Sequence, residues 1–255
     1  MEKSTEMKKL HLIMPMGGAG SRFFKDGYVM PKPLIEIEGK PFLYWATQSI
    51  CRFIDVKDLT FVVLQDHIDN FSIDSIIKKH FPNSNIVVIP GILPGPVMTC
   101  LEGLSVIHDN DPILFNDCDH MFKCSGFNKL MNSYPEGLEF DGGLITFKSD
   151  KPQFSYIKYD GNRIVGTVEK QVVSDDAICG AYIFRNSEIF RQMSEKYLKV
   201  CEYSEYFVSG IYNVMCSEGK IVKNFPVDFH VPFGTPEEYE ATKGNEHFIE
   251  LMGDR

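Results

Sequence analysis

The sequence predicts an α/β protein built on a mainly parallel mixed sheet with a hairpin-rich second half. Short apolar runs of strand length recur along the first half of the chain. Segments with helical spacing of apolar residues lie between these runs, as in βαβ units. The second half joins two strand-like runs through Asp160-Gly161-Asn162, a hairpin signal. No repeat or linker divides the chain, so we expect residues 1–255 to form a single domain.

The expected elements of the first half alternate in type. The run KLHLIMPM, residues 9–16, stops at Gly17 and should form a buried strand. Further strands are expected at residues 59–64, 86–89 and 113–115, and helices at residues 42–53, 68–81 and 97–107. Crossovers between parallel strands are nearly always right-handed, so one doubly wound sheet is the expected topology. Ligands should then bind beyond the carboxyl ends of its strands.

The second half is expected to cover the ligand site. Strands should form at residues 156–159, 163–169 and 178–184, and helices at residues 187–197 and 207–218. Ser187 is the expected N-cap of the first of these helices. Thr235 should cap a last helix that begins at Pro236. Glu237 and Glu238 would then lie at the positive end of that helix dipole.

Composition and charge exclude several classes of partner. The chain has 26 basic and 35 acidic residues and no local Lys/Arg cluster, so no nucleic-acid partner is expected. No run approaches the roughly 18 apolar residues of a membrane span. The charged start MEKSTEMKK does not fit a signal peptide, so we expect a cytoplasmic protein without a membrane partner. Seven cysteines without a CxxC pair indicate free thiols rather than disulfides or zinc ligands.

Residues 14–41, MPMGGAGSRFFKDGYVMPKPLIEIEGKP, contain the strongest functional signal. Gly17, Gly18 and Gly20 follow a strand, and glycine backbone N–H groups can approach phosphate oxygens closely. Ser21 adds a hydroxyl donor, and Arg22 adds a planar fork of donors suited to phosphate. The loop therefore predicts phosphate binding.

A lysine between two prolines strengthens this interpretation. Pro31 and Pro33 restrict the backbone around Lys32, so its ammonium group is presented in a limited direction. A dinucleotide-binding fingerprint does not fit, because it needs a small residue where Phe23 stands. A P-loop does not fit either, because the required Gly-Lys-Ser/Thr is missing. On their own, the glycines would fit a tight turn equally well.

An acidic segment follows the strand expected at residues 113–115. Asp117 and Asp119 lie two residues apart at its carboxyl end, an arrangement that suits a hard cation such as Mg²⁺. Such an ion would neutralise the charge of bound phosphate groups. Asp117 alone would more often cap a turn. His120 is expected to be structural rather than a metal ligand.

The pattern GG-x-G-S/T-R followed by PKP-L resembles the signature of the sugar-phosphate nucleotidyltransferases (NDP-sugar pyrophosphorylases), and the resemblance covers most of the chain. PQFSYIKYDG, EKQVVSDDAICGAYIF and FGTPEEY resemble a branch found in bacterial capsule and surface-polysaccharide loci. The resemblance implies a GT-A-like, Rossmann-like three-layer α/β/α fold. It implies NTP binding by the glycine loop, catalytic roles for Arg22 and Lys32, and Mg²⁺ at Asp119, with Asp117 as a second ligand or an orienting residue.

The same resemblance implies two further binding regions. Gly95 and Thr99 resemble the segment that contacts the base and ribose, although Pro94-Gly95-Pro96 would fit a rigid turn equally well. An acceptor site is implied for Ser155, Tyr156, Glu169, Lys170 and Gly180. Glu169-Lys170 resembles an acceptor-binding pair, and an exposed pair on a hairpin end is the alternative.

One position departs from the family pattern. Many relatives have a second metal-binding aspartate just before a Gly-Thr-Pro tripeptide, and Pro232 stands at that position here. Either Asp119 and the substrate phosphates suffice to hold the ion, or another residue such as Asp228 replaces the missing aspartate.

The resemblance implies transfer of a nucleoside monophosphate from an NTP to a phosphorylated small molecule, first of all a sugar 1-phosphate, in surface-polysaccharide precursor synthesis. Pyrophosphate is released by direct in-line displacement, which needs no Ser-His or Cys-His nucleophile. Two alternatives stay open: a cytidylyltransferase for a phosphorylated amino acid, polyol or choline, and an inactive nucleotide-binding regulatory protein. The oligomeric state is also open, a homo-oligomer included.

Overall fold

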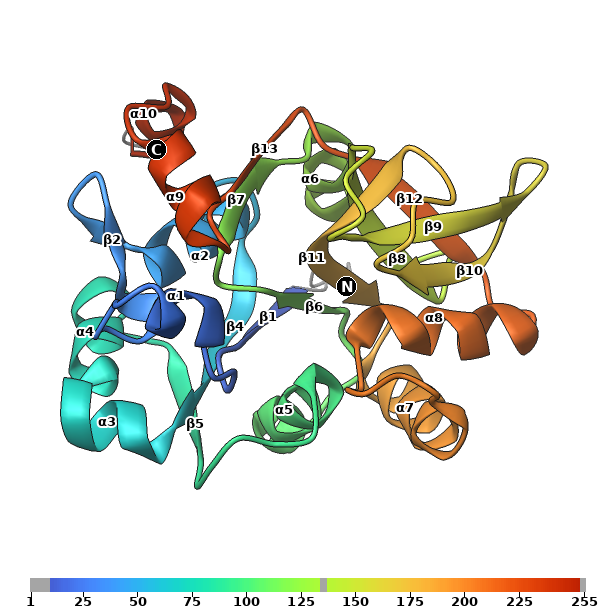
Figure 1. Cartoon of the computed structure of the whole chain (residues 1–255). Helices are drawn as coiled ribbons and strands as arrows, with labels where there is room; N and C mark the ends of the chain where they lie inside the picture. The colour runs from blue at the N-terminus through green and yellow to red at the C-terminus, as the bar shows by residue number, and fades with distance from the viewer. Residues whose placement is uncertain (1–9, 134–136, 253–255) are drawn as a thin grey trace, which may run out of the picture.

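A computed structural model of the chain describes residues 10–133 and 137–252 (Figure 1). Within this part, a nine-stranded sheet runs through the middle of the molecule. Its strands are β1 (Leu10–Pro15), β4 (Val56–Leu64), β5 (Asn85–Ile89), β6 (Ile113–Asn116), β8 (Gly142–Lys148), β9 (Ser155–Asp160), β10 (Arg163–Glu169), β11 (Asp176–Phe184) and β12 (Val222–Pro226). The strand order is β10-β9-β11-β6-β1-β4-β5, and β8 pairs with β11 and β12.

Parallel pairing dominates the part of the sheet formed by the first half of the chain. Strands β6, β1, β4 and β5 are neighbours and run parallel to one another. Strand β11 is antiparallel to β6, and the hairpin of β9 and β10 continues antiparallel beside it. The mixed, mainly parallel α/β fold predicted from the sequence is confirmed, as is the hairpin at Asp160-Gly161-Asn162.

Helices cover both faces of the sheet, so the molecule has three layers (Figure 1). One face packs against α5 (Pro96–Gly103), α7 (Ser187–Val200) and α8 (Val208–Ser217). The other face packs against α2 (Phe42–Cys51), α4 (Ile73–His80) and α6 (Ser125–Asn132). Leu12 and Met14 belong to the apolar cluster beneath α2, α4 and α6, whereas Ile13 belongs to the cluster beneath α5, α7 and α8. This division follows from the two-residue period of a strand, which sends successive side chains to opposite faces.

Smaller elements complete the fold. They are α1 (Ser21–Lys25), the 3₁₀ turns Lys32–Leu34 and Leu104–Val106, β2 (Glu36–Ile37), β3 (Lys40–Pro41), α3 (Gln65–Phe71), β7 (His120–Lys123), β13 (Phe229–Pro232), α9 (Pro236–Thr242) and α10 (His247–Met252). Strands β7 and β13 form a separate antiparallel ribbon. A third apolar cluster, which includes Phe23, Trp45 and Phe233, joins α1 and α2 to the C-terminal segment.

Three local expectations can be compared with these elements. The predicted helix at residues 68–81 is divided into α3 and α4, because Ser72 adopts a left-handed conformation with φ of 53° between them. The N-cap of α7 is Asn186 rather than Ser187, since the Asn186 side chain accepts a hydrogen bond from the N–H of Ile189. Thr235 caps α9 as predicted. The expected start of the first strand at Lys9 lies outside the described residues. Separately, none of the described helices is long and apolar enough to cross a bilayer.

Candidate active site

The glycine-rich loop and the acidic segment leave the sheet next to each other. Strand β1 ends at Pro15 and β6 ends at Asn116, and the two strands pair in parallel. The segments that follow them therefore emerge at the same carboxyl edge, which is where open α/β sheets bind ligands. The two strongest motifs of the sequence thus reach one place through the pairing of these two strands.

A cavity of about 540 Å³ lies at this edge, and we call it the glycine-loop cavity. It is lined by the residues predicted to bind the NTP, namely Gly17, Gly18, Gly20, Ser21, Lys32, Gly95 and Thr99, together with Asp117. Leu93 and Pro94 add apolar surface, and Glu205 adds a carboxylate. The volume is within the range of about 300–1,000 Å³ found for small-molecule sites.

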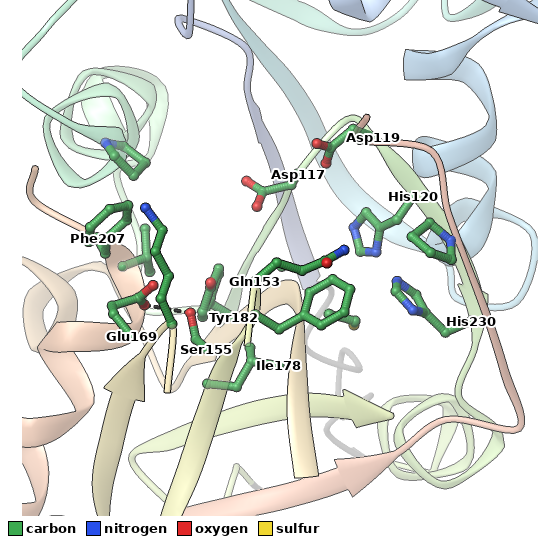
Figure 2. Close-up of a pocket in the computed structure, with 18 of the residues that line it drawn as sticks. Asp117, Asp119, His120, Gln153, Ser155, Glu169, Ile178, Tyr182, Phe207 and His230 are labelled. Atoms are coloured by element: carbon green, nitrogen blue, oxygen red, sulfur yellow. Dashed lines mark hydrogen bonds between the residues drawn. The ribbon is translucent and has the colours of Figure 1, made fainter. Parts of the chain in front are cut away.

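A second cavity, of about 320 Å³, adjoins the first, and we call it the hairpin cavity (Figure 2). Its lining includes Arg22, Asp117, Asp119, Ser155, Glu169, Lys170 and Gly180. Asp117, Pro96 and Glu205 line both cavities, so the two spaces meet at these residues. A ligand in one cavity would lie directly beside a ligand in the other.

An ion pair connects the two cavities. Lys32 Nζ donates to Asp119 Oδ2 over 2.8 Å. Burial alone would lower the pKa of Lys32, but the Asp119 carboxylate outweighs burial and raises it. Burial alone would likewise raise the pKa of Asp119, and the charge of Lys32 holds it below the ordinary value. Both groups are therefore charged at neutral pH.

The position of Asp117 depends on a glycine in the neighbouring strand β11. The Asp117 N–H donates to the carbonyl oxygen of Gly180 over 2.9 Å. Gly180 has a φ of +85°, and a Cβ at this position would lie 2.6 Å from Asp117 Oδ2. Burial and the nearby Asp119 carboxylate raise the pKa of Asp117. A positive charge placed between these two carboxylates would therefore be strongly favoured.

Glu169 lies across the hairpin cavity from Asp119 (Figure 2). Two hydroxyl groups hold its carboxylate in place. Glu169 Oε1 accepts hydrogen bonds from Ser155 Oγ and Ser209 Oγ. Lys170 has a positive φ of 53°, and its Nζ lies 5.3 Å from the centroid of the Phe207 ring. Glu169 and Lys170 both line the cavity rather than only an exposed hairpin end.

Tyr156 is the one predicted site residue that the structure does not bring to either cavity. Its ring is fully buried, and its hydroxyl donates to the carbonyl oxygen of Lys151 over 2.6 Å. Neighbouring side chains of a strand point to opposite faces, so Ser155 of β9 faces the cavity while Tyr156 faces the core.

Several lining residues were not predicted from the sequence. Glu238 accepts hydrogen bonds from the N–H of Gly234 over 3.0 Å and from Gln153 Nε2 over 2.8 Å. A Cβ built at Gly234 would lie 2.6 Å from Asp119 Oδ2 and 3.5 Å from Glu238 Oε2, so the two carboxylates flank this glycine. His230 also lines the cavity. The acidic first turn of α9 and the family-like stretch FGTPEEY, which contains Glu238, were signals that could have drawn attention to this residue.

The carboxylates at the junction of the two cavities fit a divalent cation. Asp117 and Asp119 offer the oxygen ligands that Mg²⁺ prefers, and among the ion pairs between described residues none involves Asp117. Pro232 lines the hairpin cavity without offering a ligand. Asp228 does not replace the missing aspartate, because its carboxylate accepts the N–H of Ser125 at the start of α6.

His120 and His230, which lie across the hairpin cavity from Glu169, are neutral. Burial lowers the pKa of His120 to about 4. Burial also lowers the pKa of His230 well below its ordinary value. These imidazoles can therefore offer lone pairs at neutral pH.

Comparison with solved structures supports the fold. A nucleoside-diphosphate-sugar pyrophosphorylase from Vibrio cholerae RC9 superimposes with a TM-score of 0.77 at 20% identity, covering 90% of this chain and 98% of its own. An inositol-1-phosphate CTP transferase from T. maritima gives a TM-score of 0.71 at 16% identity, covering 96% of this chain and 95% of its own. Comparison with curated proteins gave no significant match.

Comparison with protein families gives a match that spans nearly the whole chain. The matched family is described as nucleotidyl transferase, and the match covers residues 11–241. It includes both the glycine loop and the segment of Asp117 and Asp119, which the structure brings to one sheet edge. With its fold and its cavity-lining residues, the chain belongs to the nucleotidyl transferase family.

Proposed function

We propose that this chain transfers a nucleoside monophosphate from an NTP to a phosphorylated small molecule and releases pyrophosphate, with a sugar 1-phosphate as the first acceptor to test. The observation that supports this best is the pair of adjoining cavities that share Asp117. One is lined by the glycine loop and Lys32, the other by Arg22 and the hairpin. Resemblance to proteins of capsule loci extends the proposal to surface-polysaccharide precursor synthesis.

The proposed reaction is a direct in-line displacement. A phosphate oxygen of the acceptor attacks the α-phosphorus of the NTP, and the bond between that phosphorus and the oxygen bridging to the β-phosphate breaks. Pyrophosphate leaves with the electron pair of this bond, so no covalent intermediate with the protein is required. The protein contributes by positioning two anionic reactants and by stabilising the charge that develops between them.

Cationic side chains near the junction of the cavities fit these tasks. Lys32 would place its ammonium group beside the α-phosphate, and Arg22 would contact phosphate oxygens from the hairpin side. A divalent cation such as Mg²⁺, held by Asp119 with Asp117, would neutralise triphosphate charge when bound. Backbone N–H groups of the glycine loop would bind the remaining phosphate oxygens.

The acceptor would occupy the hairpin cavity. Its hydroxyl groups would donate to the Glu169 carboxylate, and Lys170 would interact with its phosphate. Gly95 and Thr99 of the glycine-loop cavity would contact the base and ribose. This arrangement would place the acceptor phosphate and the NTP at the junction of the two cavities.

A second candidate is a cytidylyltransferase for a non-sugar phosphate, such as a polyol phosphate. It is favoured by the fold shared with the T. maritima protein, which is named for inositol 1-phosphate and CTP. The two candidates use the same chemistry and the same junction at Asp117, and they differ in the base and in the acceptor.

Pyrophosphate release tests both candidates together. The purified chain is incubated with Mg²⁺ and each of CTP, UTP, dTTP, ATP and GTP, combined with sugar 1-phosphates, polyol phosphates, phosphocholine and phosphorylated amino acids. Release that requires one NTP together with a sugar 1-phosphate supports the main proposal. Release with CTP and a non-sugar phosphate supports the second candidate.

A thermal-shift measurement with the same NTPs separates the remaining outcome. A ligand that binds only the folded state raises the melting temperature. Stabilisation by an NTP without turnover on any acceptor would indicate an inactive nucleotide-binding protein. Neither stabilisation nor pyrophosphate release with any pair would contradict the proposal.

A further inference from the structure

Two histidines and a cysteine from three separate strands meet in the wall of the hairpin cavity. They are His120 of β7, Cys179 of β11 and His230 of β13. A ring nitrogen of each histidine and Cys179 Sγ all lie within 4.8 Å of one another. Figure 2 shows His120 and His230 together, close to Asp119 but on the other side of the cavity from Glu169.

The hydrogen bonds around His120 leave one of its nitrogens as a free lone pair. Asn116 Nδ2 donates to the carbonyl oxygen of Ala46 over 3.0 Å, which orients Asn116 Oδ1 as an acceptor. His120 Nε2 lies 3.1 Å from that oxygen and therefore carries the ring proton. His120 Nδ1 is then unprotonated. Among the described residues it has no hydrogen-bond partner, although the side chain is only 2% exposed.

His230 has fewer hydrogen-bond partners among the described residues than His120. Both ring nitrogens of His230 are buried without a hydrogen-bond partner among the described residues. Its ring is packed against Phe147, with centroids 4.0 Å apart, and against His120, with centroids 5.4 Å apart. A buried polar group without a partner costs about 1–3 kcal/mol, so three such nitrogens in one cluster indicate a missing ligand.

We propose that His120, Cys179 and His230 bind Zn²⁺, with a fourth coordination position open to the hairpin cavity. Imidazole and thiolate are the ligands that Zn²⁺ prefers, and three protein ligands with one open position are typical of accessible zinc sites. Zinc bonds of about 2.0 Å to nitrogen and 2.3 Å to sulfur place tetrahedral ligands about 3.3–3.6 Å apart. The three ligand atoms now lie within 4.8 Å of one another, so small side-chain movements would bring all three to bonding distance of one zinc ion.

Asn116 adds a feature that zinc sites commonly have. A metal-binding histidine usually donates its other ring N–H to a fixed acceptor, which sets the tautomer, and Asn116 Oδ1 fills this role for His120. Binding would release the thiol proton of Cys179 to solvent, so that a Zn–S bond replaces the S–H bond. This site is distinct from the carboxylates of Asp117 and Asp119, which suit a harder ion.

Cobalt binding tests the proposal without any assay of turnover. The untagged full chain is stripped of metal with a chelator, and Co²⁺ is titrated while its visible spectrum is recorded. We expect the strong absorption of tetrahedral Co²⁺ and a near-ultraviolet thiolate-to-cobalt band, both saturating at one ion per chain and both removed by Zn²⁺. A wild-type chain that gives neither band nor retains zinc after dialysis overturns the proposal.

Variants identify the ligands. Cys179→Ser should abolish the thiolate band, and His230→Ala should weaken Co²⁺ binding by at least about 10–100-fold, the effect that even outer-shell partners have. Cys216→Ser removes another buried thiol outside the cluster and should leave the spectrum unchanged. Asp119→Asn should also retain it. An unaltered spectrum in the double variant of Cys179→Ser and His230→Ala would place the metal elsewhere and refute the assignment.

Discussion

Lys32 and Asp119, 87 positions apart in the chain, form an ion pair that joins the glycine-loop cavity to the hairpin cavity. Their side chains are 27% and 24% exposed, so the pair is accessible to a ligand and only partly screened by water. Pro31 and Pro33 flank the lysine, and the turn between β6 and β7 holds the aspartate. A cation and an anion are thus fixed where the proposed reaction needs both.

Replacing Lys32 by Ala is expected to lower kcat for pyrophosphate release by about 10²–10³-fold, the usual effect of removing one group that stabilises transition-state charge. Asp119→Ala should have an effect of at least this size. Circular dichroism should show a folded protein in both cases. Full activity in both variants would refute the assigned roles.

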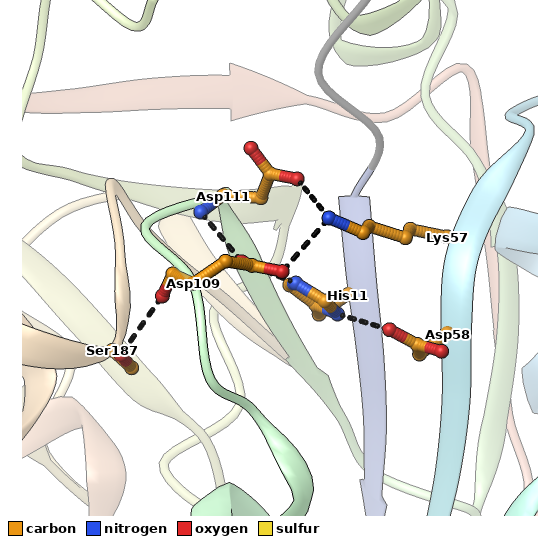
Figure 3. Close-up of polar contacts among 6 residues, drawn as sticks. All are labelled: His11, Lys57, Asp58, Asp109, Asp111 and Ser187. Atoms are coloured by element: carbon orange, nitrogen blue, oxygen red, sulfur yellow. Dashed lines mark hydrogen bonds and ion pairs between the residues drawn. The ribbon is translucent and has the colours of Figure 1, made fainter.

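Lys57 offers a matched control for this experiment. It too is paired with carboxylates, Asp109 and Asp111, each at 2.8 Å, but it lies at the opposite end of β1 (Figure 3). Lys57→Ala should therefore leave turnover per folded molecule unchanged.

Glu169→Gln is expected to act on the acceptor rather than on the NTP. The amide keeps the shape of the side chain but loses the charge that strengthens hydrogen bonds from acceptor hydroxyls, an effect of about 1.5–3 kcal/mol. The KM for the acceptor should rise about 10–100-fold, and the KM for the NTP should change less than about twofold. Steady-state kinetics with each substrate varied in turn measures this difference.

Glu218→Gln is the control for Glu169. Glu218 is paired with Lys196 at the end of α8, outside both cavities, and its replacement should change neither KM. A rise in both substrate KM values for Glu169→Gln would point instead to a general disturbance of the junction.

Local sequence patterns predicted the parallel core of the fold well, because buried strands and amphipathic helices have periodicities that a few residues reveal. The ribbon of β7 and β13 was missed. Its strands, HMFK and FHVP, are four residues long and contain histidine or lysine. Their pairing, Val231 with Met121 for example, links segments more than a hundred residues apart. Local patterns do not encode contacts of that range.

Some residues of the candidate site also belong to local sequence motifs, whereas others come together only through folding. The glycine loop and Lys32 are local motifs, and Asp117 and Asp119 follow a strand, so local patterns single these residues out. The assignment of the metal to Asp119 came from the family resemblance and stays a prediction. Glu238 reaches the cavity only through the packing of α9. Cys179 and His230 lie in different strands without a CxxC or similar spacing, so the cysteine count favoured free thiols. Their proximity exists only in three dimensions.

Acid should remove a stabilising contribution of Asp109. Its carboxylate accepts hydrogen bonds from Lys57 Nζ and from the Asp111 N–H, and it lies 2.8 Å from His11 Nε2 (Figure 3). Burial alone would raise the pKa of Asp109, but these partners outweigh burial and lower it. A lowered folded-state pKa stabilises the protein above the unfolded value of about 3.9, and the contribution is lost as pH falls below it.

Urea unfolding at about pH 7 and about pH 3 measures this contribution. Asp109→Asn should lower the free energy of unfolding by about 1–2 kcal/mol at neutral pH, a value reduced for partial exposure. The difference from wild type should shrink in acid. Asp175→Asn is the control, because Asp175 is 74% exposed and its pair with Lys148 should contribute little. A difference that does not change with pH would show that the charge of Asp109 is not responsible.

Gly180→Ala should inactivate the enzyme, and Gly161→Ala should not, although both glycines have positive φ, at +85° and +57°. Either substitution imposes backbone strain of about 1–2 kcal/mol, so both variants should melt at lower temperature. Only at Gly180 would the new Cβ approach a carboxylate, 2.6 Å from Asp117 Oδ2, whereas nothing lies within 4 Å at Gly161. Asp117 must then move away from the junction of the cavities. Pyrophosphate release below the melting temperature of both variants checks this, and equal activities would show that the position of Asp117 is not critical.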